Sequence, residues 1–314
     1  MKKLIALTLA VLMILSLFSA CGGGQTANPD EIGESNVQPT AAPNDPLSDG
    51  TSLKVLAIGN SFSNDTTEFL YDVAKAEGVT DIVLGRLYIG GCSLEKHANN
   101  AATNAPAYKY YRNTAGVWIP RESITMEYAL QDEQWDIITL QQNSGNSGLP
   151  ASYNGYLEQL IQYVNENKTN PNARLVWNMT WAYQEGSPEG GFKNYDNDQT
   201  TMYSAIVNTV KEVIEPNTAF SRIIPVGTAL QNVRTSYIGD NVTRDTYHLN
   251  TLGKVIGAYT WYAVFTGKTL DTLKLELSPT ILLLTDNDKA TIAEAVNAAI
   301  QTPYAVTQST HLTR

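Results

Sequence analysis

The sequence predicts an α/β protein: a three-layer α/β/α sandwich around a central, mostly parallel sheet of about five strands. Short β-rich segments alternate along the chain with longer amphipathic segments, which is the pattern of parallel strands joined by helices. The first short segment is apolar on both faces, as a strand covered by helices on both sides should be. Residues 52–314 are long enough for one such domain.

The predicted strands and helices follow one another in order. The strands are residues 53–59, 81–91, 135–142, 173–181 and 221–227. The first helix, 64–78, has Asn64 or Asp65 near its N-cap and Gly78 beyond its end. Further helices are predicted at residues 156–168, 200–215, 250–267 and 286–301. Parallel sheets form their sites beyond the carboxyl ends of the strands, so chemistry is expected in the loops that follow the strands.

The N-terminal residues predict a lipoprotein signal peptide over residues 1–20. Lys2 and Lys3 precede an apolar run, and "FSAC" is similar to a bacterial lipobox, so the mature chain is expected to begin at a lipidated Cys21. Residues 21–51 are rich in Gly, Pro, Asn, Ser and acidic residues, which predicts a flexible, lipid-anchored linker. The expected location is the cell membrane, outside the cytoplasm, with membrane contact through the lipid only. The alternative is an ordinary signal with a stray cysteine.

The composition narrows the partners. The chain has 31 acidic and 21 basic residues, a net charge of −10, which argues against nucleic acid. No cofactor is expected, and no metal, because no cluster of His, Cys and Asp would bind one. Besides Cys21 the chain contains one cysteine, Cys92, which is interpreted as a small buried apolar group.

The stretch "VLAIGNSFSND" puts Ser61 on a Gly-Asn turn at the end of the first predicted strand. A serine nucleophile needs a base, and histidine is the usual one. Of the three histidines, His311 lies at the C-terminus, where fraying is expected, and His97 follows the second strand as a candidate for contact with substrate. His248 has Asp245 three residues before it, a spacing that can orient the imidazole. The alternative is that Asn60-Ser61 is a turn with a helix cap and Asp245 another cap.

Together these blocks resemble the SGNH (GDSL-like) serine hydrolase superfamily over residues 53–267, and in particular a branch that carries "IGNSFS". The resemblance implies a flavodoxin-like fold, Ser61 as nucleophile and Asp245 with His248 as acid and base. It also implies an oxyanion hole built from Ser61, a glycine of the second block and an amide of the third. The glycine is expected to be Gly91, with Gly90 as the alternative. The third block, "LQQNSG", departs from the usual Gly-x-Asn-Asp, which leaves Asn143 and Gln142 open.

The sequence therefore predicts a serine esterase that removes acetyl or other small acyl groups from carbohydrates. Tyrosine (17) outnumbers phenylalanine (6), and tyrosines gather in two segments, 108–111 and 180–198, which are expected to be loops at the site. Such side chains suit acylated sugars, which offer apolar ring faces and hydroxyls. The alternative is a lipid-anchored glycan-binding protein on a hydrolase-like scaffold. A lipase is disfavoured because no long apolar lid segment occurs.

Overall fold

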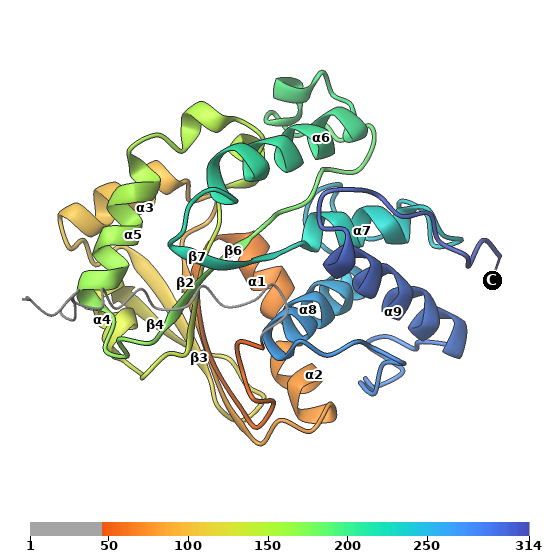
Figure 1. Ribbon diagram of the computed structural model, residues 1–314, viewed down its shortest axis with the longest axis horizontal. Coiled ribbons are helices and arrows are strands. Elements are labelled where there is room, and N and C mark those ends of the chain that lie inside the picture. The colour runs from red at the N-terminus through yellow and green to blue at the C-terminus, as the bar shows by residue number, and fades with distance from the viewer. Residues whose placement is uncertain (1–45, 314) are drawn as a thin grey trace, which may run out of the picture. The chain divides into compact units, whose positions relative to one another are not determined.

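The computed structural model describes residues 46–313, which are built around a seven-stranded sheet in the order β4-β3-β2-β1-β5-β6-β7 (Figure 1). The predicted signal peptide, Cys21 and most of the predicted linker lie outside these residues. Within the described part, Leu47 is buried, and the N–H groups of Leu47 and Ser48 both donate to the carbonyl oxygen of Phe265. The packed region therefore extends N-terminal to Ser52, into the segment expected to be linker.

The five predicted strands form the parallel part of the sheet. They are β1 (Ser52–Gly59), β2 (Asp81–Tyr88), β5 (Ile137–Leu140), β6 (Arg174–Asn178) and β7 (Phe220–Ile224). Their order, β2-β1-β5-β6-β7, is the flavodoxin-like order of a doubly wound sheet. The reversal of direction beside β1 leaves a crevice at the carboxyl ends of the central strands, where Ser61 follows β1.

The prediction of about five strands was wrong, because an antiparallel hairpin extends the sheet beyond β2. Its strands are β3 (Tyr108–Asn113) and β4 (Ile119–Ile124). The tyrosine segment 108–111 is thus part of a strand, in which buried Tyr108 and Tyr110 alternate with half-buried Lys109 and Tyr111. This alternation is a strand signal. β4 is mostly exposed and carries Pro120 and two charged residues, as edge strands often do.

Helices cover both faces of the sheet (Figure 1). On one face α3, α4 and α5 contact one another, and on the other α8 packs against α1, α2, α7 and α9. The bounds of these helices are α1 Ser61–Thr67, α2 Leu70–Ala76, α3 Leu94–Ala102, α4 Met126–Gln131, α5 Tyr156–Asn167, α7 Val226–Arg234, α8 Thr251–Thr266 and α9 Asp286–Gln301. α6 (Gln199–Thr209), extended by a π-helical turn at Val210–Ile214, connects β6 to β7.

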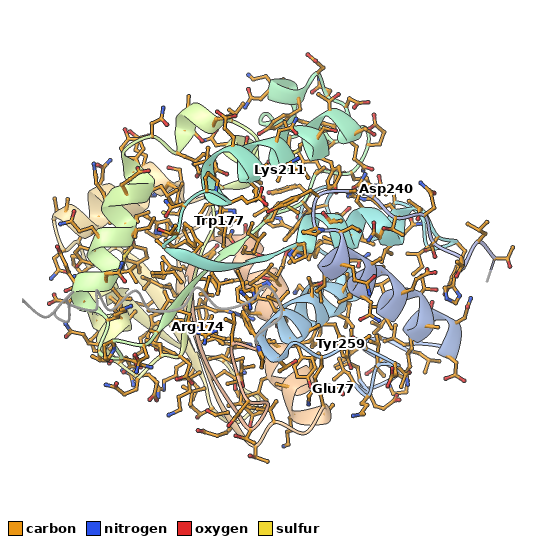
Figure 2. All side chains as sticks on the ribbon, viewed as in Figure 1. Glu77, Arg174, Trp177, Lys211, Asp240 and Tyr259 are labelled. Carbon is orange, nitrogen blue, oxygen red and sulfur yellow. The ribbon has the colours of Figure 1, made fainter. Side chains whose placement is uncertain are left out.

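Long-range hydrogen bonds tie helices of the α8 face together and hold the C-terminal segment. Figure 2 shows Tyr259 of α8 near Glu77 at the end of α2, and the Tyr259 hydroxyl donates to the Glu77 carboxylate at 3.4 Å. The C-terminal segment is also held in place. The carbonyl oxygen of His311 accepts from the Tyr237 N–H, and Nδ1 of the His311 ring lies 3.0 Å from Asn287 Oδ1. The expectation that His311 frays was therefore wrong.

The first predicted helix is two helices, α1 and α2, and it begins earlier than expected. Asn60, rather than Asn64 or Asp65, is the N-cap, since its side chain accepts the N–H of Phe62. Ser61 is consequently the first residue of α1. Gly78 does follow the end of α2, in a left-handed conformation (φ +98°) that glycine adopts without strain.

Candidate active site

The turn Gly59-Asn60-Ser61 places Ser61 directly beyond the carboxyl end of β1. A Cβ on Gly59 would lie 2.7 Å from the Ser63 hydroxyl oxygen, so a larger residue here would displace the buried Ser63 side chain. Asn60 is buried, and besides capping α1 its Nδ2 donates to the carbonyl oxygen of Cys92 at 3.1 Å. The turn is therefore tied both to its own helix and to the loop after β2.

The structure brings Ser61 next to His248 and Asp245. His248 Nε2 lies 2.8 Å from Ser61 Oγ, and His248 Nδ1 lies 2.8 Å from Asp245 Oδ2. The backbone N–H of His248 donates to the other carboxylate oxygen, Asp245 Oδ1, at 2.8 Å. Burial alone would raise the pKa of Asp245, but the hydrogen bonds from His248 outweigh it and hold that pKa below its ordinary value. An ionised Asp245 can only accept, which places the proton on Nδ1 and leaves Nε2 to accept from Ser61.

Thr246 holds this loop in a strained conformation between Asp245 and His248. Its φ of +74° lies in the left-handed region, which a β-branched residue rarely adopts. The Gln184 N–H donates to the Thr246 carbonyl oxygen at 2.8 Å, and the hydroxyls of Thr246 and Ser187 lie 2.8 Å apart. The segment after β6 thus imposes the conformation that presents the imidazole.

Asp65 joins the histidine loop to the helix that carries Ser61. Its buried carboxylate accepts from Arg244 Nη1 at 3.0 and 3.1 Å and from the Leu249 N–H at 2.9 Å. Burial raises the pKa of Asp65, while the charges of Arg244 and Lys254 oppose that rise. One carboxylate on α1 therefore anchors both ends of the loop that contains Asp245 and His248.

Three buried side-chain amides and one indole form a hydrogen-bonded series, here called the amide chain, which ends at Asn60 in the serine turn. Trp261 Nε1 donates to Asn178 Oδ1 (3.2 Å), and Asn178 Nδ2 donates to Gln141 Oε1 (2.8 Å). Gln141 Nε2 in turn donates to Asn60 Oδ1 at 2.9 Å. Every member of this amide chain is at most 2% exposed. This hydrogen-bonded series runs across the carboxyl ends of three parallel strands, and no local pattern in the sequence marks it.

A cavity of about 340 Å³ opens beside Ser61. It is lined by Asn60, Ser61, Tyr88, Gly90, Gly91, Asn143, Ser144, Tyr183, Glu189, Tyr247 and His248. A larger hollow of about 920 Å³ lies beside β7, α8 and α9, and none of the candidate site residues lines it. Chemistry is therefore expected in the smaller cavity, because the serine and the histidine meet there.

The candidates for the oxyanion hole differ in how they are placed. Gly91 (φ +61°) and Asn143 both line the cavity, and Asn143 Nδ2 donates to the Gly91 carbonyl oxygen at a long 3.3 Å. Gln142 is buried outside the lining. Its Oε1 accepts the N–H groups of Leu94 and Asn143, and its Nε2 donates to Ser152. Gly90 also lines the cavity.

His97 and Cys92 are buried and do not line the cavity. His97 is 1% exposed, its ring is stacked on Tyr108, and its Nδ1 lies 3.0 Å from the Tyr108 hydroxyl. Burial lowers the pKa of His97 to about 3, so the ring is neutral. Contact between His97 and substrate, which the sequence suggested, is excluded by this burial. Cys92 is fully buried, which raises the pKa of its thiol to about 12.

Neither a metal cluster nor a membrane span is found in residues 46–313. No group of three His, Cys, Asp or Glu side chains in this part of the chain could hold a metal ion. Its helices are also too short or too polar for any of them to cross a bilayer.

Strand order and site together define a flavodoxin-like α/β protein with a hydrogen-bonded serine, histidine and aspartate at the carboxyl edge of its sheet. The chain belongs to the DUF4886 family, a domain of unknown function, whose family pattern matches residues 54–287. Sequence and structure are similar to those of a DUF4886 family protein from Bacteroides uniformis, known from a crystal structure. The two are 41% identical, with a TM-score of 0.77, over 83% of this chain and 100% of that one.

A second solved structure, a candidate SGNH hydrolase from Slackia heliotrinireducens, is 17% identical with a TM-score of 0.44. The match covers 68% of this chain and 98% of that one. No curated protein matches the sequence.

Proposed function

We propose that this protein is a serine esterase of the SGNH type, with Ser61 as nucleophile, His248 as base and Asp245 as the acid that orients it. The observation that carries the proposal is the continuous hydrogen-bonded chain from Ser61 Oγ through the imidazole to the Asp245 carboxylate, which opens onto a cavity. A free serine hydroxyl is a weak nucleophile, and this arrangement activates it.

The reaction proceeds in two acyl transfers. His248 Nε2 takes the hydroxyl proton as Ser61 Oγ attacks the ester carbonyl carbon. The N–H groups of Ser61 and Gly91 and the side-chain amide of Asn143 stabilise the oxyanion. His248 then gives the proton to the departing alcohol as the carbon–oxygen bond breaks, which leaves an acyl group on Ser61. Water, deprotonated by His248, attacks this acyl ester and releases the acid and the free serine.

The proposed substrates are carbohydrates that carry acetyl or other small acyl groups. The cavity is at the small end of the range for ligand pockets. Two of its lining residues are Tyr88 and Tyr247, whose half-buried rings suit sugar faces, while Asn143, Ser144 and Glu189 offer partners for hydroxyls. Lipidation at Cys21, beyond the described residues, would hold the enzyme outside the cytoplasm, where polysaccharides occur.

The test is hydrolysis of aryl esters from acetyl to octanoyl, together with acetylated xylan, pectin and sialic acid. We expect the acetyl ester to be preferred and acetate to be released from at least one glycan, because a cavity of this small volume has no room for a long acyl chain. Preference for octanoyl with no acetate release would point to a lipase. Glycan binding without hydrolysis, unchanged by Ser61→Ala, would support the glycan-binding alternative.

A further inference from the structure

Glu189 places a carboxylate without a partner in the wall of the cavity. It is half-buried, and within residues 46–313 its carboxylate makes no hydrogen bond or ion pair. Among the residues that line the cavity it is the one acidic side chain, and none of them is lysine or arginine. A carboxylate that the protein itself does not use is available to a ligand.

The loop that carries Glu189 is fixed relative to His248. The Glu189 N–H donates to Ser187 Oγ at 3.4 Å, and Ser187 Oγ lies 2.8 Å from the Thr246 hydroxyl. The Phe192 N–H donates to the Glu189 carbonyl oxygen at 2.9 Å. The backbone at Glu189 is therefore held in place, and its side chain lines the same cavity as Ser61 and His248.

The charge of Glu189 acts on two of the tyrosines that line the cavity, Tyr183 and Tyr247. Burial raises the pKa of the Tyr183 phenol to about 12, and the Glu189 charge adds to that rise while a hydrogen bond with Ser144 opposes it. For Tyr247, burial again raises the pKa most, and Glu189 is the next cause.

Arg244, in the loop that carries His248, and Lys254, in α8, pair with carboxylates other than Glu189. Arg244 pairs with Asp65, and its Nε lies 3.9 Å from Asp245, while Lys254 Nζ lies 3.8 Å from Asp65. Among the side chains that line the cavity, no lysine or arginine balances the charge of Glu189. Such a carboxylate accepts hydrogen bonds from hydroxyl and ammonium groups and repels a second carboxylate.

We propose that Glu189 determines specificity: the site takes acyl esters of neutral or positively charged sugars and rejects acyl esters of acidic sugars such as uronic and sialic acids. This inference rests on the proposed esterase function. It adds that the charge of the sugar, and not only the size of the acyl group, selects the substrate.

The test uses three aryl acetates of similar shape and different charge: 4-acetoxybenzoate, 4-acetoxybenzamide and 4-acetoxy-N,N,N-trimethylanilinium. For each ester, kcat/KM of Glu189→Gln is divided by that of the unchanged protein, which cancels the differences in leaving-group reactivity. We expect the ratio to be roughly five to ten for the anion and its inverse for the cation, and within about twofold of one for the neutral amide. High salt should shrink both departures, because the cavity is open to screening ions.

Glu158→Gln is the matched control, because it removes the same charge from the exposed face of α5, away from the cavity. Acetylated xylan against acetylated polygalacturonate extends the test to glycans. The unchanged protein should release acetate faster from acetylated xylan than from acetylated polygalacturonate, and Glu189→Gln should reduce the difference between the two rates. Equal ratios for all three esters would overturn the inference even if Ser61→Ala abolishes hydrolysis. Hydrolysis that survives Ser61→Ala would instead overturn the proposed function.

Discussion

The serine turn (Gly59–Ser61) and the histidine loop (Arg244–Leu249) meet at one 2.8 Å contact but are held by different forces. Neutral groups hold the turn: Asn60, Gln141, Asn178 and Trp261 are all buried and uncharged. Charged groups contribute to holding the loop, through the ion pair Asp65–Arg244 and through the Asp245 carboxylate, which accepts from His248. The neutral hydrogen bonds of Thr246 hold the loop as well.

The difference teaches that the two halves of the site should respond differently to their surroundings. Hydrogen bonds between neutral amides change little with pH or salt, whereas charged pairs depend on protonation and are screened where solvent reaches them. The position of Ser61 should therefore be constant, and the position of His248 should be the condition-dependent part of the site. Four predictions probe this comparison.

The largest effect is expected where the two regions touch. Ser61→Ala and His248→Ala should each lower kcat for an aryl acetate by up to about a million-fold, because nucleophile and base act as one unit. For the same reason the double variant should be little worse than either single one. Circular dichroism should show unchanged folding. Additive losses would mean that the two residues work independently.

The amides that follow β5 should separate into a catalytic and a structural group. Asn143→Ala removes a proposed oxyanion donor and should lower kcat about 100- to 1,000-fold with little change in KM. Gln142→Ala leaves the N–H groups of Leu94 and Asn143 without their acceptor, and should mainly lower the melting temperature. If Gln142→Ala is the variant with the larger loss of kcat at normal stability, the assignment of the two amides must be exchanged.

Arg244→Met tests the charged region. It removes the hydrogen bonds from Arg244 to the buried Asp65 and should lower the free energy of unfolding by about 1.5–3 kcal/mol at neutral pH. Burial already raises the pKa of Asp65 above 3.8, and loss of the opposing Arg244 charge raises it further. When the pKa of a carboxyl group is raised in the folded state, the folded protein loses stability as pH rises through that pKa. The deficit should thus shrink as pH falls toward 3.8, which urea unfolding at several pH values measures.

Gln141→Leu makes the matching change in the neutral region. Asn178 Nδ2 loses its acceptor inside the core, while Asn60 Oδ1 keeps the Phe62 N–H, so we expect a loss of about 1–2 kcal/mol. The loss should be the same at every pH and salt concentration at which the Arg244→Met deficit varies. Gln162→Leu, on the exposed face of α5, is the control for the chemical change. A pH-dependent deficit for Gln141→Leu would remove the distinction between the two regions.

The sequence by itself determined the parallel core of the sheet and the residue types at the site. Strands β1, β2, β5, β6 and β7 were predictable because continuous apolar segments between helical segments are a local pattern. The blocks around Ser61 and His248 are also local patterns, so they could be recognised. Asp245 is only three residues from His248, so the pairing of these two residues could be predicted. The strands β3 and β4 were missed because tyrosines and charged residues on a half-exposed hairpin resemble a polar loop.

Only the tertiary structure decided which of these residues meet. Ser61 and His248 are 187 positions apart, and their contact depends on strand order and on the strained backbone at Thr246. The amide chain, the anchoring role of Asp65 and the unpartnered carboxylate of Glu189 have no local signature. A hydrogen bond between distant side chains follows from the packing of the elements that carry them, and periodicity along the chain contains no information about that packing.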